Sequence, residues 1–178
     1  MNECKPLTLE DFDRLDESFR FETTLDATPE RVFEVFEDPE SWPIWARAIQ
    51  KVTWTSPKPF AVGTTRDVDI VGGLVAHERF FVWEPPHRMA FYFVGTSKPA
   101  VASLAEYYEL EPLSGGRSRF VWRVAYESRS RMRYVSPLLR PAVRLFMARI
   151  VKGLERYVSE LPPPETASTP SREARACG

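Results

Sequence analysis

Residues 138–161 carry apolar side chains at steps of three and four, which is the spacing of a long helix with one apolar face. The basic residues Arg140, Arg144, Arg149, Lys152 and Arg156 are expected on the opposite side, and Pro141 falls in the first turn, where proline is tolerated. A helix of this kind needs a second layer that covers its apolar face. The apolar positions are Leu138, Leu139, Val143, Phe146, Ile150, Leu154, Tyr157 and Leu161.

The sequence before this helix supplies strands for that layer. Residues 18–27 alternate Phe19, Phe21 and Leu25 with polar side chains, which is the period-two pattern of a half-buried strand. Six more strand-like runs follow, most of them separated by turns rich in glycine or proline. They span residues 51–55, 64–71, 74–83, 88–94, 101–111 and 119–127. Seven antiparallel strands, joined mainly as hairpins, are therefore expected.

Two short helices are predicted between the first and second strands. Thr28 is a helix-capping residue and Pro29 suits the first helical position, so a helix is expected from here to Phe36. A second helix, residues 40–48, carries Trp42 and Trp45. The predicted fold is therefore α+β, with a seven-stranded antiparallel sheet wrapped around the long C-terminal helix and two short helices after the first strand.

The chain has 178 residues, which suits one domain with tails. Residues 1–16 are polar and acidic, and residues 162–178 begin with three prolines and continue with polar residues, so both are predicted to be tails around a domain at residues 17–161. The net charge of −1 conceals a strong asymmetry. Residues 1–40 hold 13 acidic and 4 basic residues, whereas residues 129–156 hold 8 basic residues and 1 acidic residue.

Several classes of function lack their sequence signatures. Cys4 and Cys177 lie in the predicted tails and only two histidines are present, so we expect no metal site and no cofactor. No nucleophile elbow or phosphate-binding glycine loop is found, and no basic and aromatic platform predicts nucleic-acid binding. The chain has no signal-peptide pattern and no transmembrane segment, and we expect it to be cytoplasmic.

Three local motifs resemble one known superfamily. They are ATPERVF at residues 27–33, DPESWP at residues 38–43 and VWEPPHRMAF at residues 82–91. Together with the order of the predicted elements, they resemble the START-like (SRPBCC, Bet v 1-like) helix-grip superfamily, and the third motif resembles its polyketide cyclase/dehydrase branch. This resemblance covers residues 17–161 and implies a helix-grip fold with an internal cavity for a hydrophobic ligand.

Alternation assigns the inner face of two strands. Phe120, Trp122, Val124 and Tyr126 alternate with charged residues and are expected to point inward. By the same rule Leu104, Glu106, Tyr108 and Leu110 point inward. In the run at residues 74–83 the pattern is ambiguous. There the resemblance implies that Arg79 corresponds to a cavity arginine of the aromatic polyketide cyclases, which would place His77, Phe81 and Trp83 inside as well.

These residues suggest a cyclase or dehydratase that acts on a hydrophobic, partly oxygenated small molecule without a cofactor. In that hypothesis Arg79 polarises a carbonyl group, Tyr108 donates a proton, and Glu106 or His77 removes one. A tyrosine of the aromatic cyclases is replaced by Ile49, which weighs against direct transfer of their mechanism. The expected ligand-binding residues are Trp42, Phe81, Trp83, Tyr92, Leu104, Trp122, Tyr126, Phe146 and Ile150.

Other interpretations remain open at this point. Arg79 and Glu106 could form a structural ion pair, His77 could be a structural histidine, and the aromatic residues could be core alone. The alternative function is a non-catalytic carrier of a lipid or quinone. The basic side of the long helix is either a solvated surface or a docking face for an acidic partner, such as an acyl carrier protein or an anionic membrane surface.

Overall fold

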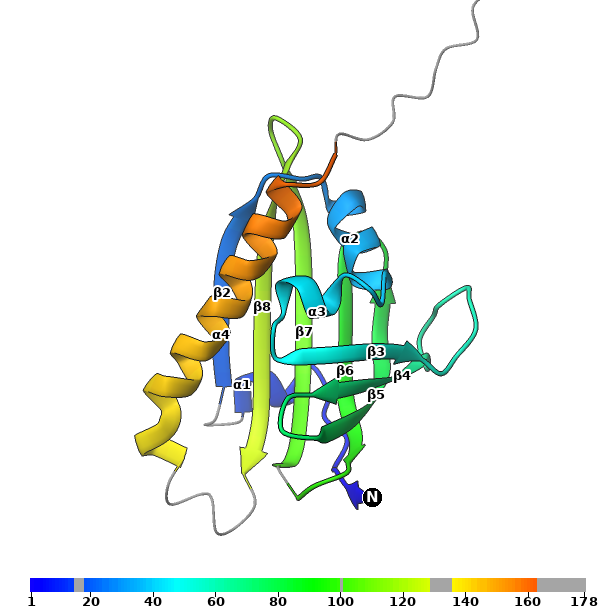
Figure 1. Ribbon diagram of the computed structural model, residues 1–178, viewed down its shortest axis with the longest axis vertical. Coiled ribbons are helices and arrows are strands. Elements are labelled where there is room, and N and C mark those ends of the chain that lie inside the picture. Colours follow the sequence, from blue (N-terminus) through cyan, green and yellow to red (C-terminus); the bar gives the residue numbers. More distant parts are fainter. Residues whose placement is uncertain (15–17, 100, 129–135, 163–178) are drawn as a thin grey trace, which may run out of the picture.

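The computed structural model describes residues 1–14, 18–99, 101–128 and 136–162, and it contains the predicted α+β architecture (Figure 1). The helices are α1 (Asp11–Arg14), α2 (Pro29–Glu37), α3 (Trp42–Trp45) and α4 (Ser136–Ser159). The strands are β1 (Asn2–Glu3), β2 (Ser18–Leu25), β3 (Ile49–Trp54), β4 (Thr65–Ile70), β5 (Leu74–Glu84), β6 (Arg88–Thr96), β7 (Val101–Leu113) and β8 (Arg117–Ser128).

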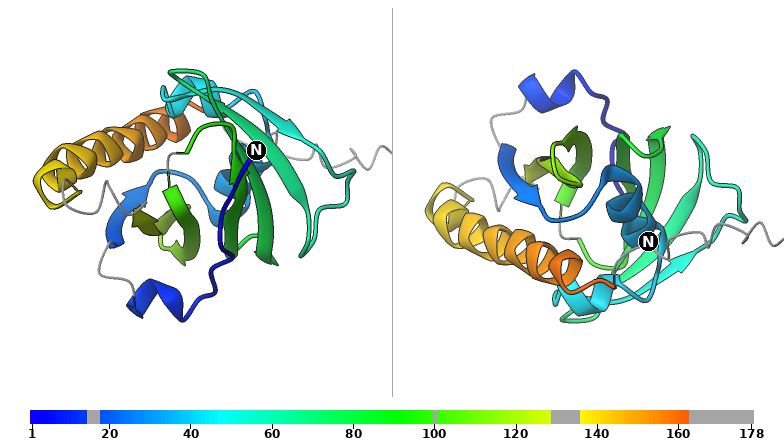
Figure 2. Two further views of the ribbon diagram at one scale, coloured as in Figure 1. Left: turned by 90° about the horizontal axis from the view of Figure 1, so that it is seen from below. Right: turned by 90° about the horizontal axis from the view of Figure 1, so that it is seen from above.

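The predicted seven antiparallel strands form one sheet in the order β2-β8-β7-β6-β5-β4-β3. The sheet curves around the C-terminal helix α4, so the expected helix-grip fold is confirmed (Figures 1 and 2). An eighth, two-residue strand, β1, pairs with β6 through Asn2 and Glu3. We call the sheet face toward α4 the inner face and the opposite face the outer face.

The short helices form where the capping signals predicted them. The Thr28 hydroxyl accepts a hydrogen bond from the backbone N–H of Arg31, and Pro29 is the first residue of α2. Ser41 joins α2 to α3, because its hydroxyl donates to the backbone oxygens of Val35 and Asp38. The Trp42 indole N–H donates to the backbone oxygen of Phe36, 3.0 Å away. These hydrogen bonds join α2 to α3, and the ring contacts of Phe36 and Trp42 with Tyr108 place the segment on the inner face.

Helix α4 is anchored mainly by its second half. Val151, Leu154 and Val158 are buried there. A Cβ atom added at Gly153 would collide with the backbone oxygen of Trp45, so the glycine permits the close approach of α4 to α3. In the first half Phe146 is 47% exposed. The apolar stripe of α4 therefore covers the sheet at one end of the helix and leaves it at the other.

The N-terminal residues differ from the prediction. Residues 1–14 were expected within a polar tail, but residues 2–3 form β1 beside β6, and α1 lies on the opposite side of β2 and β8 from α4 (Figure 2). Leu7 and Phe12 are buried there with a small second cluster around Ala90, Ala105 and Ala125. The three alanines leave room on the outer face for these two side chains, a feature that composition does not reveal. Most of the predicted C-terminal tail, residues 163–178, lies outside the described residues.

Candidate functional site

A hydrogen-bonded group of polar side chains lies on the inner face, centred on Glu106 of β7. The Tyr108 hydroxyl donates to Glu106 Oε2 at 2.5 Å, and the Trp122 indole N–H donates to the same oxygen at 2.9 Å. Glu106 and Tyr108 are two residues apart on β7, and Trp122 lies opposite Tyr108 on β8, so the sheet register alone brings the three together. Tyr108 and Trp122 are buried, whereas Glu106 keeps part of its surface accessible.

The surroundings of Glu106 change its acidity. Burial raises the pKa of Glu106 to about 7, and the nearby Glu78 carboxylate acts in the same direction, while the two hydrogen bonds and Arg66 oppose the rise. The pKa of Tyr108 lies well above its ordinary value because of burial and the adjacent Glu106. At neutral pH both forms of Glu106 are therefore populated, and the tyrosine stays protonated. This pair can accept and donate a proton near pH 7.

A second buried polar pair lies beside this group. Arg66 of β4 and Glu78 of β5 face each other directly in the sheet, and Arg66 Nε donates to Glu78 Oε2 at 2.6 Å. The side chains of Arg66 and Glu78 are only 1% and 5% exposed. Burial raises the pKa of Glu78 above its ordinary value, although the arginine opposes the rise. The inward-facing arginine with a carboxylate partner is therefore Arg66, whereas Arg79 was the predicted cavity arginine.

Aromatic rings enclose the arginine and connect it to Tyr108. The guanidinium carbon of Arg66 lies 4.3 Å from the ring centre of Trp42 and 4.8 Å from that of Phe91. The same two rings contact Tyr108, with ring centres 6.5 and 6.0 Å apart. Arg66 Nη1 is buried and has no hydrogen-bond partner among the described residues. It is therefore a donor that a bound molecule could satisfy.

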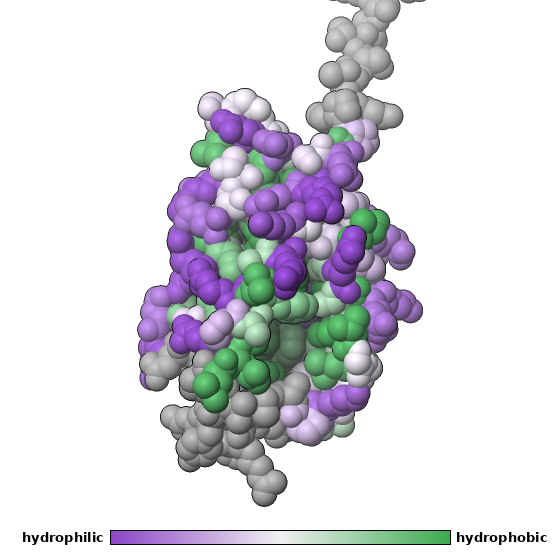
Figure 3. Space-filling model, turned by 60° about the vertical axis from the view of Figure 1, so that its left-hand side comes forward, coloured by the Kyte–Doolittle hydropathy of each residue, from purple (hydrophilic) through white to green (hydrophobic). Residues whose placement is uncertain are grey.

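Most of the predicted ligand-binding residues of the other elements face inward. Trp42, Trp83, Leu104 and Trp122 belong to the main core or pack against it, as does the partly buried Ile150 of α4. Tyr126 stacks on Phe19 of β2 with ring centres 6.0 Å apart. Leu104 near the start of β7, Tyr126 near the end of β8 and Ile150 of α4 remain partly accessible, so the inner face is not fully covered at these positions. Figure 3 shows a recess bordered by hydrophobic residues on this side of the molecule.

The structure corrects four predicted residues of β5 and β6. Arg79 is exposed, and His77 is partly exposed with its Nδ1 2.7 Å from Asp67 Oδ1. Phe81 and Tyr92 pack together against the outer cluster, with ring centres 6.0 Å apart. None of the four lines the inner face. The alternative of an Arg79–Glu106 ion pair is therefore wrong.

A β-bulge explains the error. The register of β5 and β6 shifts between Phe80 and Val82, so Phe81 is an extra residue in the ladder. Trp83 is buried on the inner side. Strict alternation from Trp83 toward the start of β5 would place Phe81, Arg79 and His77 on the inner side too, but the bulge reverses the alternation, so these three residues do not face inward. Beyond the bulge the inner residues of β5 are Phe80, Glu78 and Ala76.

The sequence contained a signal for Arg66 that alternation could have revealed. Arg66, Val68 and Ile70 alternate with Asp67 and Asp69 along β4. Two aspartates on one side predict that the other side, including the arginine, faces the core. Arg66 is the arginine on that apolar side of β4, so this pattern predicts that it faces inward.

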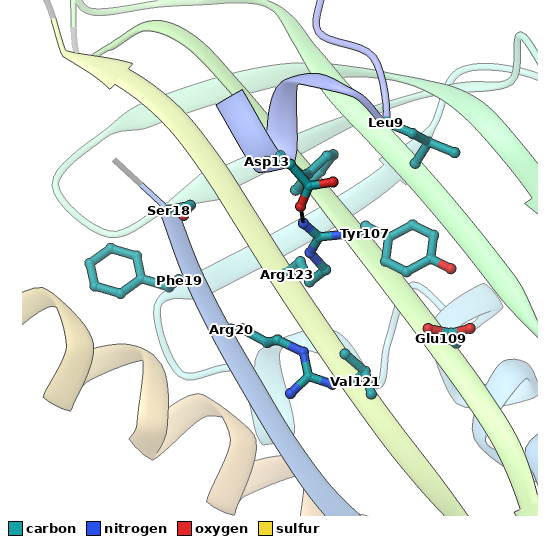
Figure 4. A pocket seen from close by; sticks show the side chains of 10 residues that line it. Leu9, Asp13, Ser18, Phe19, Arg20, Tyr107, Glu109, Val121 and Arg123 are labelled. Atoms are coloured by element: carbon teal, nitrogen blue, oxygen red, sulfur yellow. Dashed lines mark hydrogen bonds and ion pairs between the residues drawn. The ribbon is translucent and has the colours of Figure 1, made fainter. Parts of the chain in front are cut away.

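The outer face carries a separate pocket of about 750 Å³ between α1 and strands β2, β7 and β8 (Figure 4). Both of its arginines are neutralised, because Arg123 pairs with Asp13 of α1 and Arg20 pairs with the neighbouring Glu22 at 2.7 Å. Tyr107 and Val121 form part of its floor (Figure 4). No group of three potential metal ligands occurs within the described ranges. Within the same ranges no helix is long and apolar enough to cross a bilayer.

Solved structures of the same fold include an aromatase/cyclase. The Zhui aromatase/cyclase from Streptomyces sp. R1128 matches with a TM-score of 0.66 and 14% identity, covering 80% of this chain and 93% of that chain. A START superfamily protein from Mycobacterium smegmatis matches with a TM-score of 0.64 and 15% identity, covering 82% and 99%. At these identities the two matches show the fold alone.

Sequence comparison identifies the family. Two uncharacterized proteins, one from Mycobacterium tuberculosis and one from Mycobacterium bovis, are each 45% identical to this chain over 139 residues, which is 78% of this chain and 83% of the relative. The family model described as polyketide cyclase/dehydrase and lipid transport matches residues 16–160. The inner-face carboxyl, tyrosine and arginine thus lie in a chain that belongs to the polyketide cyclase/dehydrase and lipid transport family.

Proposed function

We propose that the protein binds a flat, largely apolar molecule with a ketone or hydroxyl group on the inner face of the sheet, and that Glu106 exchanges a proton with it. The observation that carries the proposal is the state of Glu106. It is a partly accessible carboxyl group with a pKa of about 7, surrounded by aromatic rings and hydrogen-bonded to Tyr108 and Trp122. A general base works best when its pKa lies near the working pH.

The chemistry that fits this arrangement is dehydration or aldol-type ring closure. With a β-hydroxy ketone, the Glu106 carboxylate removes the proton from the carbon between the two oxygenated carbons, and the electron pair moves onto the ketone oxygen as an enolate. Arg66 Nη1, which has no hydrogen-bond partner among the described residues, is the available donor for that oxygen. The carbon–oxygen bond then breaks, and the leaving hydroxide takes the proton from Glu106 as water. In ring closure the same enolate attacks a second carbonyl group instead.

The test uses a phenyl-substituted β-hydroxy ketone, whose dehydration gives an enone with strong ultraviolet absorbance. Wild-type protein should accelerate enone formation, and the rate should rise as pH increases through about 7, because the ionised form of Glu106 is the base. Glu106→Gln should lower the rate by about 10²-fold or more. Glu109→Gln is the matched control, because Glu109 lies three residues away on β7 and lines the outer pocket. Equal rates for wild type and Glu106→Gln would reject Glu106 as the base.

A carrier function is the second candidate, and the paired state of the inner polar groups favours it. Glu78 neutralises Arg66, and Glu106 already accepts two hydrogen bonds, so these groups are stable without a reacting substrate. Native mass spectrometry of the purified protein distinguishes the two functions. Wild type and Glu106→Gln should carry the same unaltered molecule if the protein is a carrier. If it is an enzyme, the variant should accumulate a precursor that wild type converts.

A further inference from the structure

The outward side of α4 carries exposed apolar residues at its N-terminal end. Leu138 is 81% exposed, Leu145 is 54% exposed and Phe146 is 47% exposed. Ile44 of α3 is 61% exposed, and it lines a groove of about 540 Å³ together with Phe146. Large apolar side chains gathered on one surface indicate an interaction site.

Basic residues without acidic partners lie next to these apolar residues. Arg47, Arg149, Lys152 and Arg156 line the same groove, all four are exposed, and none forms an ion pair within the described part of the chain. Elsewhere on the surface basic residues are commonly neutralised by ion pairs with nearby carboxylates. These neutralised residues include Lys5, Arg20, Arg31, Lys58, Arg88, Arg119 and Arg123. Four basic residues without an ion-pair partner among the described residues therefore gather around α3 and α4, beside the single acidic residue of the groove, Glu160.

The apolar and basic residues share one side of α4. At about 100° per residue, Leu138, Leu145, Arg149 and Arg156 lie within about 40° of one another around the helix axis. Arg140 and Arg144 were predicted on this basic side of the helix. They reach β2 instead. Their guanidinium groups lie over Phe19 and Phe21, at 5.5 and 5.3 Å from the ring centres. The outward stripe is thus apolar in its first half and basic in its second, over about 27 Å from Leu138 to Arg156.

We infer that this outward stripe of α4, with the neighbouring Ile44 and Arg47, docks on the surface of an anionic lipid bilayer. Leu138 and Leu145 enter the boundary between head groups and acyl chains, and Arg149, Lys152 and Arg156 contact the phosphates. A bilayer accepts side chains that project singly from a convex helix, whereas a protein partner needs a pocket for each. A second copy of this chain would bring the same positive charges together, so charge opposes a symmetric dimer through this surface.

Docking in this orientation would place the open end of the inner face near the lipid. Leu104 lies near the start of β7 and Tyr126 near the end of β8, and these ends of the two strands lie at the same end of the molecule as the start of α4 (Figure 1). A hydrophobic molecule could then move between bilayer and protein with little exposure to water. The docking inference itself goes beyond the proposed function and does not depend on the chemistry at Glu106.

The contribution of the basic residues to membrane binding can be measured by flotation of the protein with lipid vesicles. The two preparations are phosphatidylcholine alone, and phosphatidylcholine with phosphatidylglycerol in a seven-to-three ratio. Wild type should bind the anionic vesicles and not the neutral ones, and added salt should weaken binding. Arg149→Gln combined with Arg156→Gln should weaken binding about 30-fold, because each basic residue near an anionic surface contributes about fivefold and the two factors multiply. Equal binding to both vesicle types would overturn the inference.

A matched control removes the same charge from another surface. Arg79 and Arg117 are exposed and form no ion pair among the described residues, so Arg79→Gln with Arg117→Gln should leave vesicle binding unchanged. An equal loss in this control would show that net charge, and not the stripe, controls binding. Glu106→Gln should also bind vesicles normally, which separates this test from that of the proposed function.

The apolar contribution needs a second variant. Leu138→Ala with Leu145→Ala keeps good helix formers at exposed positions, so the fold should be retained, as circular dichroism can verify. Binding to anionic vesicles should fall by about 10-fold or more, because two leucine side chains no longer leave water. Analytical ultracentrifugation tests the alternative that the stripe binds a second copy of this chain. A wild-type dimer that the leucine variant abolishes would identify a second copy, and not a bilayer, as the occupant.

Discussion

The carboxyl group of Glu106, which is partly buried on the inner face, makes the free energy of unfolding of the protein depend on pH. The pKa of Glu106 is about 7 in the folded protein against an ordinary value of 4.5, a difference of about 2.5 pH units. Each pH unit corresponds to about 1.4 kcal/mol, so Glu106 changes the free energy of unfolding by roughly 3 kcal/mol. Between these two values the folded protein binds more protons than the unfolded chain. Its stability therefore falls as pH rises.

Glu106→Gln removes this dependence, because glutamine does not titrate and its oxygen can still accept the hydrogen bonds from Tyr108 and Trp122. Below about pH 4.5 Glu106 is protonated in both states and the two proteins should be similarly stable. Above about pH 7 the variant should be more stable than wild type by up to roughly 3 kcal/mol. The raised pKa of Glu78 contributes a slope of the same sign to both proteins.

Urea unfolding followed by tryptophan fluorescence gives the measurement, repeated across the range from about pH 4.5 to about pH 8. Glu109→Gln again serves as the control and should follow wild type, because its carboxyl belongs to the outer pocket. A stability difference between wild type and Glu106→Gln that does not change with pH would refute the reasoning. It would mean that Glu106 has an ordinary pKa in the folded protein, and the general-base proposal would lose its basis.

Three further predictions concern packing, the buried ion pair and the face of β5. Gly153→Ala normally favours a helix, but here the added Cβ meets the Trp45 backbone, so we expect a loss of about 1–3 kcal/mol and a lower melting temperature; a stabilised variant would contradict the close helix contact. Glu78→Ala leaves Arg66 buried without its carboxylate and should cost about 3–5 kcal/mol in urea unfolding, whereas Arg66→Met combined with Glu78→Leu should recover much of this stability. Arg79→Ala should change the enone assay and stability little, since Arg79 is exposed; a large loss of enone formation would return this residue to the site.

The sequence was sufficient to predict the features of the fold that depend on local signals. Thr28 and Pro29 mark the start of α2 because capping depends on neighbouring backbone groups only. Glu106, Tyr108 and Trp122 were assigned to one face because β7 and β8 keep an unbroken alternation through these residues. The family motifs also identified the helix-grip fold, since they report the order of its elements.

The assignment failed on β5, where the alternation was ambiguous and the resemblance to a cavity arginine was extended along the strand in steps of two, although one inserted residue reverses the alternation. The bulge at Phe81 depends on how β6 pairs with β5, so a period-two pattern read along β5 alone cannot locate it. As a result, Arg79 and His77 were predicted on the inner face of β5 in place of Glu78. Arg66 was not predicted to face inward, although its own strand alternates regularly. The pairing of Arg66 with Glu78 is a property of two strands in register and not of either strand alone.

The sequence by itself determined the elements, their order and the sides of the regular strands, because hydrophobic periodicity and capping act over a few residues. Only the tertiary structure decided which arginine is buried, and how far α4 follows the sheet. Gly153 lets the second half of α4 pack closely on Trp45, whereas Leu138 and Phe146 in the first half stay exposed, and both depend on elements far away in the sequence. An apolar stripe predicts that a helix can be covered, but the path of the neighbouring elements determines where the covering ends.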